Sequence, residues 1–339
     1  MNNIMNELIS VIVPAMNAEL YIKSCLDSVY SQDYPTIEVI VVYDTKSNDN
    51  TLRELNSYKI SHPSLIIDIG YDENLGSARN RGLDLASGDY IVHIDADDLL
   101  MPNYLSILYD MLQNSPDASI ACCNYLPVTN GNILSCINIA NKSSDNRYIY
   151  SKGEAFQHML SISDVGRKLP NALWVWMVRK SFLIEQKIRH PNYSYGEDAG
   201  YTWRIIGQSN IICVTDKVLY LYRVNENSMT QNLPLNYCDL LSKSVNDVAE
   251  YLYRIYPDIL PTYYNFWNIE YLFILLKHDY SEYISGVNKY IGVRKLNPRG
   301  YSESLFTRLF VTIFNISQSI AYVAYQLYLT ASKCVSLER

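Results

Sequence analysis

The pattern of apolar and polar residues along the first 125 residues alternates between two periods. Short runs rich in valine and isoleucine are followed by segments in which apolar residues recur every three or four positions. This alternation is typical of a mostly parallel sheet flanked by helices, so we expect an α/β fold. We expect strands at residues 10–13, 37–42, 65–69, 90–94 and 119–124, and helices at residues 19–31, 51–58, 77–86 and 102–113.

The rest of the chain changes pattern twice. Residues 129–150 are rich in asparagine, serine and glycine, which is typical of an exposed loop. Beyond them we expect a helix at 154–161, a strand at 172–178, a helix at 198–207 and a strand at 211–222, and only helices after Leu235. These changes divide the chain into three segments, residues 1–125, 126–234 and 235–339.

Composition narrows the class of protein. The 339 residues are 48% hydrophobic and 19% charged, which is a globular balance, and the formal net charge of -7 argues against a general nucleic-acid binder. The seven cysteines are an odd number without a Cys-x-x-Cys spacing, so they indicate neither a disulfide framework nor a zinc ribbon. The first residues lack the features of a signal peptide, so we expect the N-terminus to stay inside the cell.

The densest acidic feature follows the fourth expected strand. In an extended segment alternate side chains share a face, so Asp95 and Asp97 are expected to point the same way at the carboxyl end of that strand, where open α/β sheets bind ligands. Carboxylate oxygens suit Mg²⁺ or Mn²⁺ bound to a phosphate group. The alternative is a solvated turn that precedes the next helix.

Three other loops are expected at the same edge of the sheet, at residues 14–19, 43–49 and 74–80. Each connects a strand to a helix and is rich in hydrogen-bonding groups. Ser77 is expected to open a helix whose free backbone N–H groups favour an anion. Taken singly, each loop is more often explained by ordinary capping and turn chemistry.

Together these segments resemble a known family. The runs SVIVPAMNA (10–18), EVIVVYD (38–44) followed by NDNT (48–51), NLGSARNRGL (74–83) and ASGDYIVHIDADD (86–98) resemble, in order and spacing, the family 2 glycosyltransferases, which have the GT-A fold. Later, YGEDAGYTWR (195–204) resembles the Glu-Asp motif on the acceptor side of that family. LYRVNENSM (221–229) is similar to its segment that closes on the donor.

The resemblance implies roles for particular residues. Residues 1–125 would be the nucleotide-sugar-binding half and residues 126–234 the acceptor-side half. The resemblance ends near residue 230, and residues 235–339 are expected to be a helical region that is a candidate for membrane association. Asp97 would be the main ligand of a divalent metal with Asp98 as its helper, and Asp198 would be the catalytic base of an inverting displacement. The residues assigned to donor binding are Pro14, Ala15, Asn17, Glu19, Asp44, Arg79 and Asp95.

Within that set, Asp44 would bind the edge of the nucleobase, Arg79 would lie near the diphosphate, and Asp95 would meet the ribose or the sugar. The alternative for Asp198 is a first-turn acid of the helix that follows it. Two positions depart from the family: Tyr43 replaces the first acid after the second strand, and Met16 stands where an aromatic residue is common.

A long stretch near the C-terminus, Leu309 to Ser332, contains no charged side chain. Its polar residues recur every three or four positions and form one stripe of a helix, which favours a helix lying in the membrane interface over one that spans the membrane. Packing against the protein itself or another subunit is the alternative. The polar stripe contains Thr312, Asn315, Ser319, Tyr322, Gln326 and Thr330, and the nearby basic residues are Arg294, Lys295, Arg299 and Arg308.

The resemblance and this helix together favour a UDP-sugar donor and a polyprenyl-diphosphate-linked saccharide acceptor. The enzyme would act at the cytoplasmic face of the inner membrane in the synthesis of O-antigen or capsule, and nucleic acid would not be a partner. Two alternatives remain at this point, a catalytically silent nucleotide-sugar-binding or scaffold protein and a nucleotidyltransferase. A dinucleotide-binding dehydrogenase is excluded, because the chain contains no Gly-x-Gly.

Overall fold

The computed structural model describes residues 7–160, 169–225, 234, 236–277, 280–291, 296 and 305–326. The chain forms two compact units. The first comprises Met1–Ala155 and Pro170–Ser244, and the second comprises Phe156–Leu169 and Val245–Arg339. The predicted segments 1–125 and 126–234 both contribute strands to the sheet of the first unit.

The first unit is built on a nine-stranded sheet of the described residues, in the order β3-β2-β1-β4-β8-β6-β9-β5, with β7 also paired to β9. Strands β1 to β4 run parallel, and β8 is antiparallel to its neighbours β4 and β6. The strands are β1 (Ile9–Ala15), β2 (Ile37–Asp44), β3 (Ile66–Gly70), β4 (Tyr90–His93), β5 (Leu99–Leu100), β6 (Ile120–Val128), β7 (Arg147–Ser151), β8 (Trp176–Arg179) and β9 (Ile211–Arg223).

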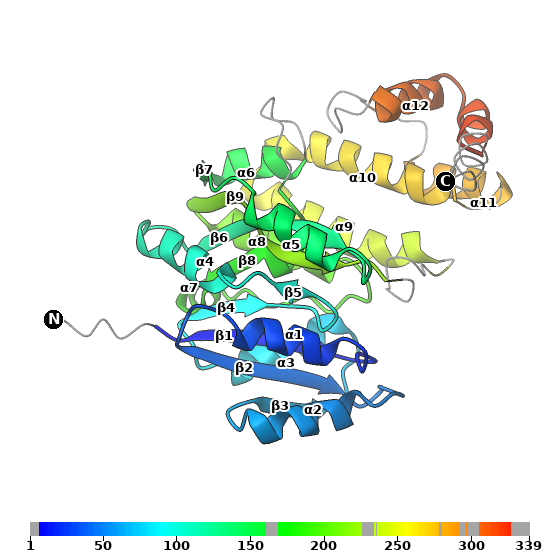
Figure 1. The fold of residues 1–339 in the computed structure, drawn as a ribbon. Helices are drawn as coiled ribbons and strands as arrows, with labels where there is room; N and C mark the ends of the chain where they lie inside the picture. The colour runs from blue at the N-terminus through cyan, green and yellow to red at the C-terminus, as the bar shows by residue number, and fades with distance from the viewer. Residues whose placement is uncertain are drawn as a thin grey trace. The chain divides into compact units, whose positions relative to one another are not determined.

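Helices join the parallel strands as right-handed crossovers, as this topology requires. The chain steps outward from β1 to β3 and then returns to β4 on the other side of β1, so α1 and α2 cover one face and α3 the other (Figure 1). The helices of this unit are α1 (Ile22–Tyr30), α2 (Thr51–Ser61), α3 (Leu75–Leu85), α4 (Tyr104–Gln113), α5 (Ile133–Asn141), α7 (Lys180–Glu185) and α8 (Glu197–Gln208). Two more, α6 (Lys152–Met159) and α9 (Tyr237–Ile255), contain the boundaries between the units.

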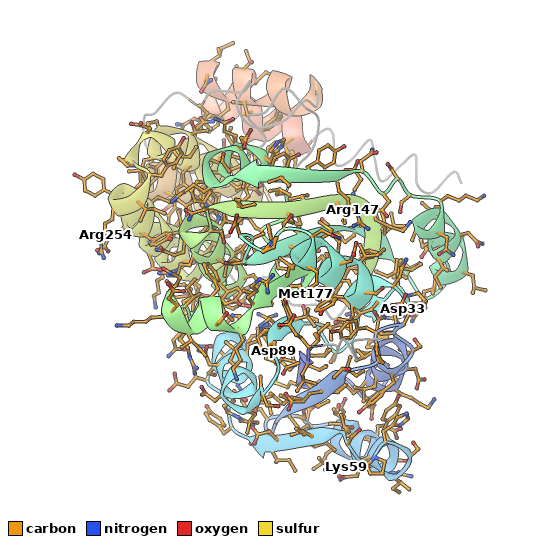
Figure 2. All side chains as sticks on the ribbon, turned by 90° about the vertical axis from the view of Figure 1, so that its left-hand side faces the viewer. Asp33, Lys59, Asp89, Arg147, Met177 and Arg254 are labelled. Carbon is orange, nitrogen blue, oxygen red and sulfur yellow. The ribbon has the colours of Figure 1, made fainter. Side chains whose placement is uncertain are left out.

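The core of the first unit lies between the sheet and these helices. Strand β1 is buried along its whole length, as expected for a parallel strand covered on both faces. Met177, labelled in Figure 2, is fully buried on β8 near the middle of the sheet. Helix α3 approaches β1 closely, because a Cβ atom on Gly82 would lie 2.4 Å from Cγ2 of Ile12. Helix α3 therefore packs directly on the face formed by β1 and β2.

The second unit is helical in its described residues. It contains α10 (Leu260–Leu275), α11 (Tyr280–Gly286), a π-helix (Val287–Ile291) and α12 (Leu305–Ile316), with a 3-10 turn at Pro257–Ile259. After a break at Ser317 the chain is helical again through residues 318–326. In the part of the chain that the structure describes, no helix has the length and apolarity needed to cross a membrane.

The two helices at the C-terminal end bury the apolar side chains of Phe310, Val311, Phe314, Ala321 and Tyr325, and they also make polar contacts with the chain. The side chain of Asn315 bonds both the N–H and the C=O of Leu296, at 2.9 and 2.7 Å, and Gln326 donates to the carbonyl of Leu276 at 2.9 Å. The exposed large apolar residues are Ile316, Ile320 and Val323. Arg294, Lys295, Arg299 and Thr330 lie outside the described residues.

The predicted fold class is confirmed, and most elements of the first half lie within a few residues of their expected positions. Residues 129–150 are mostly exposed, as predicted, but the prediction that they form a loop is wrong, because α5 and the start of β7 occupy the segment. β7 pairs with β9, and α5 buries Cys136 and Ala140. The expected strand at 172–178 is also partly wrong, since residues Leu173–Val175 form a 3-10 turn and β8 begins at Trp176. Local composition cannot report a pairing with a distant strand.

Candidate active site

The acidic segment after β4 forms a tight turn. The strand ends at His93, and the N–H of Asp98 donates to the carbonyl of Asp95 at 3.0 Å. Asp95 and Asp97 remain partly exposed, whereas Ala96 and Asp98 are buried. The expectation that Asp95 and Asp97 share a face is therefore consistent with their exposure, and Asp98 faces inward.

Asp98 anchors this turn to β9. Its two carboxylate oxygens accept hydrogen bonds from the Tyr220 hydroxyl at 2.5 Å and from the N–H of Arg223 at 2.6 Å. Burial, followed by the nearby charges of Asp95 and Asp97, raises the pKa of Asp98 well above its usual value. With both oxygens already bonded, Asp98 orients the turn. Asp97 is the carboxylate better placed to bind a metal.

Asp97 is held more loosely. The Nε atom of Arg223 donates to its carbonyl at 2.6 Å, and the Asn225 amide donates to its carboxylate at 2.7 Å. Burial and the neighbouring charge of Asp95 raise the pKa of Asp97 to about 6. A carboxylate whose negative charge is disfavoured in this way is stabilised by a nearby cation. The sequence indicated residues 221–229 as one segment, but it did not single out Tyr220, Arg223 or Asn225 as supports of the acids.

Arg79 is the centre of the site. It lies on α3 with no exposed surface, and its guanidinium meets three carboxylates: Nη2 is 2.8 Å from Asp95, and Nη1 is 3.0 Å from Glu197 and 2.6 Å from Asp198. Burial opposes the charge, but the three acids outweigh it and raise the pKa of Arg79 above its ordinary value. The guanidinium therefore joins the acid after β4 to the two acids that open α8.

Helix α8 presents Glu197 and Asp198 in its first turn. The helix begins after Gly196, which adopts a left-handed conformation with φ of 78° and whose carbonyl accepts from the Ser244 hydroxyl at 2.7 Å. The side chain of Asp198 is 29% exposed and that of Glu197 is 11% exposed. Of the two carboxylates, Asp198 is more accessible to a substrate.

The environment of Asp198 suits proton transfer. Burial, partly offset by Arg79 and reinforced by Glu197, raises the pKa of Asp198 to about 7. A general base works best when its pKa is near the working pH. The carboxylate of Asp198 bonds Arg79 on α3. Its role is therefore not limited to the electrostatic stabilisation that an acid in the first turn gives to its own helix.

Hydrogen bonds join the loop after β1 to the loop after β2. Asn17, with a positive φ of 52°, donates from its N–H to the Ser47 hydroxyl at 3.0 Å and accepts from the N–H of Asn48 at 2.9 Å. The carboxylate of Glu19 accepts from both the N–H and the amide of Asn50, at 2.8 and 2.9 Å. These side chains fix the shape of the loops, and Pro14 and Ala15 end β1 beside them.

Asp44 lies at the end of β2, next to these loops. One of its carboxylate oxygens accepts from the N–H of Lys46 at 2.9 Å, and the other is 3.2 Å from the Lys46 ammonium. The ammonium also lies 5.2 Å from the centre of the Tyr71 ring. This carboxylate and ammonium present one acceptor and one donor side by side.

The expectation of free backbone N–H groups at Ser77 is wrong. Helix α3 begins at Leu75, and the N–H of Ser77 donates to the side chain of its cap residue Asn74 at 3.0 Å, in a reciprocal capping box. The group is therefore satisfied within the chain.

A divalent metal fits the chemistry of this site in part. The acids Asp95, Asp97, Asp98, Glu197 and Asp198 exceed the cations Arg79 and Arg223 that contact them. Asp95 and Asp97 are both partly exposed, but Asp95 is paired with Arg79 and Asp97 is not. Among the described residues, however, no group of three or more His, Cys, Asp or Glu side chains is arranged to hold an ion. A metal bound here would depend on Asp97, with water or substrate supplying other ligands.

The segments that form this site also match known proteins. The model of the family described as Glycosyl transferase family 2 matches residues 10–158. The chain is 28% identical over 232 residues to the glycosyltransferase GlyA of Streptococcus pneumoniae serotype 4, a match that covers 67% of this chain and 32% of that protein. It is 26% identical over 262 residues to the glycosyltransferase GlyG of the same organism, covering 72% of this chain and 81% of that protein. The chain thus spans about a third of GlyA and most of GlyG.

Among solved structures, S. aureus TarS residues 1–349 in complex with UDP superimposes with a TM-score of 0.62 at 19% identity, covering 94% of this chain and 91% of that one. The same part of TarS in complex with UDP-GlcNAc gives a TM-score of 0.63 at 18% identity, with the same coverage. At this identity the likeness establishes the fold, which is of the GT-A type.

Proposed function

We propose that this chain, whose residues 10–158 match the model of glycosyl transferase family 2, moves a sugar from a nucleotide-sugar donor to a hydroxyl group of a saccharide acceptor, with inversion at the anomeric carbon. One observation carries this proposal: the Arg79 guanidinium contacts both Asp95, after β4, and Asp198, at the start of α8. The acids assigned to the donor side and the acceptor side therefore belong to one site. Filled acid positions also disfavour a catalytically silent protein of the same fold.

The donor would lie along the edge formed by the ends of β1, β2 and β4. Asp44 and the backbone of Pro14 and Ala15 would meet the nucleobase, and Asp95 the ribose or the sugar. A UDP-sugar is favoured for the donor; both oxygens of Asp44 are engaged by Lys46, one by its N–H and the other by its ammonium, so Asp44 would meet the nucleobase together with Lys46. TarS, which has this fold, binds UDP and UDP-GlcNAc. Asn17 and Glu19 would contribute by holding the two loops in shape.

The acceptor hydroxyl would approach Asp198. A sugar hydroxyl is a weak nucleophile, so the carboxylate of Asp198 takes its proton as the oxygen attacks the anomeric carbon. Arg79 holds that carboxylate in place through the contact at 2.6 Å. A Mg²⁺ or Mn²⁺ ion bound through Asp97 would supply a positive charge to the departing diphosphate. Asp98 keeps the turn that carries Asp97 attached to β9.

The acceptor is proposed to be a lipid-linked saccharide at the cytoplasmic face of the membrane, in the synthesis of a cell-surface polysaccharide such as O-antigen or capsule. The support comes from the C-terminal helices. Ile316, Ile320 and Val323 are 78%, 57% and 56% exposed, although aliphatic side chains are usually turned inward. Basic residues flank this stretch in the sequence, which favours an anionic lipid surface.

The test of the proposed reaction is a panel of UDP-, GDP- and dTDP-sugars, measured for stabilisation of the protein on binding and for Mn²⁺-dependent release of the nucleotide. A UDP-sugar is expected to raise the melting temperature and to be turned over. A protein that no nucleotide sugar stabilises would contradict donor binding. A nucleotidyltransferase would instead release pyrophosphate from a nucleoside triphosphate and a sugar phosphate.

A further inference from the structure

Residues 190–193, called here the wedge segment, lie between the helix that carries Arg79 and the helix that carries Asp198. They follow α7 and lead into α8. No feature of the sequence singled them out, and the proposed reaction does not use them. Their contacts nevertheless reach both α3 and α8.

The wedge segment is fixed to α3 at three points. The side-chain amide of Asn80, next to Arg79, bonds both the C=O and the N–H of His190, at 2.8 and 3.0 Å. A Cβ atom on Gly76 would lie 2.4 Å from the carbonyl oxygen of Pro191. The side chain of Asn192 bonds that of Asn74 and donates to Glu73 at 3.0 Å.

The other side of the wedge segment packs on α8. A Cβ atom on Gly200 would lie 2.6 Å from Cγ of Pro191 and 3.1 Å from the ring of Tyr193. The imidazole of His190 stacks on the ring of Tyr201, with centroids 4.1 Å apart and planes at 13°. Tyr201 is three positions after Asp198 and therefore lies on a neighbouring part of the same helix face.

His190 is also joined to the strand that leads to the acidic turn. Its Nε2 atom is 3.3 Å from Nε2 of His93, the last residue of β4, and both rings are buried. One ring must donate from Nε2 and the other accept there, so two neutral imidazoles in this pair carry their protons on different ring nitrogens. Burial lowers the pKa of both histidines well below the usual value, which keeps them neutral beside Arg79.

We propose that His190 is a positioning residue: through the wedge segment it sets the separation of α3 and α8, and with it the contact between Arg79 and the proposed base Asp198. The physical reason is that Gly76 and Gly200 leave no space for the segment to move toward either helix. The hydrogen bonds to Asn80 and His93 stop it from sliding along them. The effect on turnover rests on the proposed function. The effect on the start of α8 does not.

The first experiment compares His190→Leu with His190→Gln in the full-length protein. Leucine removes the bond to His93, whereas glutamine offers both a donor and an acceptor. We expect His190→Leu to speed amide hydrogen exchange across residues 197–208. It should also lower kcat for the donor found in the panel by about tenfold or more, since a displacement of a catalytic group by about 1 Å can slow the reaction by that much. The Kd for UDP, measured by calorimetry, should stay within about twofold, and His190→Gln should recover most of both losses.

The second experiment uses a smaller change at the opposite contact. Gly200→Ala places a methyl group against Pro191, and Gly131→Ala, which meets nothing within 4 Å, is its matched control. We expect Gly200→Ala to lower kcat with the Kd for UDP unchanged, and Gly131→Ala to alter neither. Equal behaviour of the two alanine variants would overturn the proposal, as would equal losses in His190→Leu and His190→Gln. If the wild type turns over no nucleotide sugar, the proposed function fails, but the exchange data still decide the positioning role.

Discussion

The Nη1 atom of Arg79 lies 2.6 Å from a carboxylate oxygen of Asp198, although the two residues are 119 positions apart in the sequence. The same guanidinium has no exposed surface and is also bonded to Asp95 and Glu197. In this arrangement Arg79 has little freedom to reach a diphosphate, the role that the family resemblance implies for it. Its geometry is that of a link between the two sides of the site.

The first prediction concerns Asp198→Asn. An amide cannot accept the proton of the acceptor hydroxyl, so transfer should fall by at least about a hundredfold while the Kd for the donor changes little. The measurement is kcat for transfer, with donor affinity by calorimetry as the control for folding. Glu197→Gln is the matched variant, and a larger loss there than in Asp198→Asn would assign the base to Glu197.

The pH dependence of transfer gives a second prediction. The base acts only when deprotonated, and the pKa of Asp198 is raised to about 7, so kcat/KM should rise with pH and level off above about pH 8. Arg79→Lys keeps a cation but loses the forked contact to several acids, so the pKa of Asp198 should rise and the curve should shift to higher pH. A pH profile identical to that of the wild type would contradict the link between these two residues.

A third prediction concerns stability after loss of the buried cation. Arg79→Met leaves three carboxylates without their partner, so the free energy of unfolding should fall by about 3–5 kcal/mol near neutral pH. The loss should be smaller near pH 4, because the acids can then be protonated. Urea denaturation at both pH values measures it. Arg189→Met, which removes an exposed ion pair with Asp84, is the control and should cost less than about 1 kcal/mol.

Asp97 provides a fourth prediction, in which stability and function move in opposite directions. Because the pKa of Asp97 is raised from 3.8 to about 6, the folded protein binds its proton more tightly than the unfolded chain does. This carboxylate therefore destabilises the fold as pH rises from about 4 through 6. Asp97→Asn should be more stable than the wild type by up to about 3 kcal/mol at pH 7.5, equally stable near pH 4, and unresponsive to Mn²⁺ in donor turnover. Retained Mn²⁺ dependence would exclude Asp97 as the ligand.

The exposed aliphatic stripe of the C-terminal helices gives a fifth prediction. If Ile316 and Ile320 contact lipid, the change of both to aspartate should reduce co-flotation with vesicles that contain anionic phospholipid, because a charge in the apolar layer is unfavourable. Ile184→Asp, at a 67% exposed position on α7, is the control for the same substitution elsewhere. Equal flotation of all variants would count against membrane docking, and a change in molecular mass would indicate contact with another subunit.

The sequence by itself determined the α/β class, the order of strands and helices in the first half, and the position of the acids after β4. These features follow from local rules: apolar periodicity separates strands from helices, and alternate exposure gives Asp95 and Asp97 one face. The resemblance of several loops, in order, to family 2 glycosyltransferases added the assignment of roles. All of this information lies within short segments of chain.

Only the tertiary structure decided which groups meet. The pairing of β7 with β9, the inward position of Asp98 and the three acids around Arg79 all depend on where distant segments lie. The free energy of such contacts comes from burial and from the pairing of charges that are taken out of water, and neither can be read from neighbouring residues. For the same reason the wedge segment gave no signal in the sequence, because its importance depends on the two helices between which it lies.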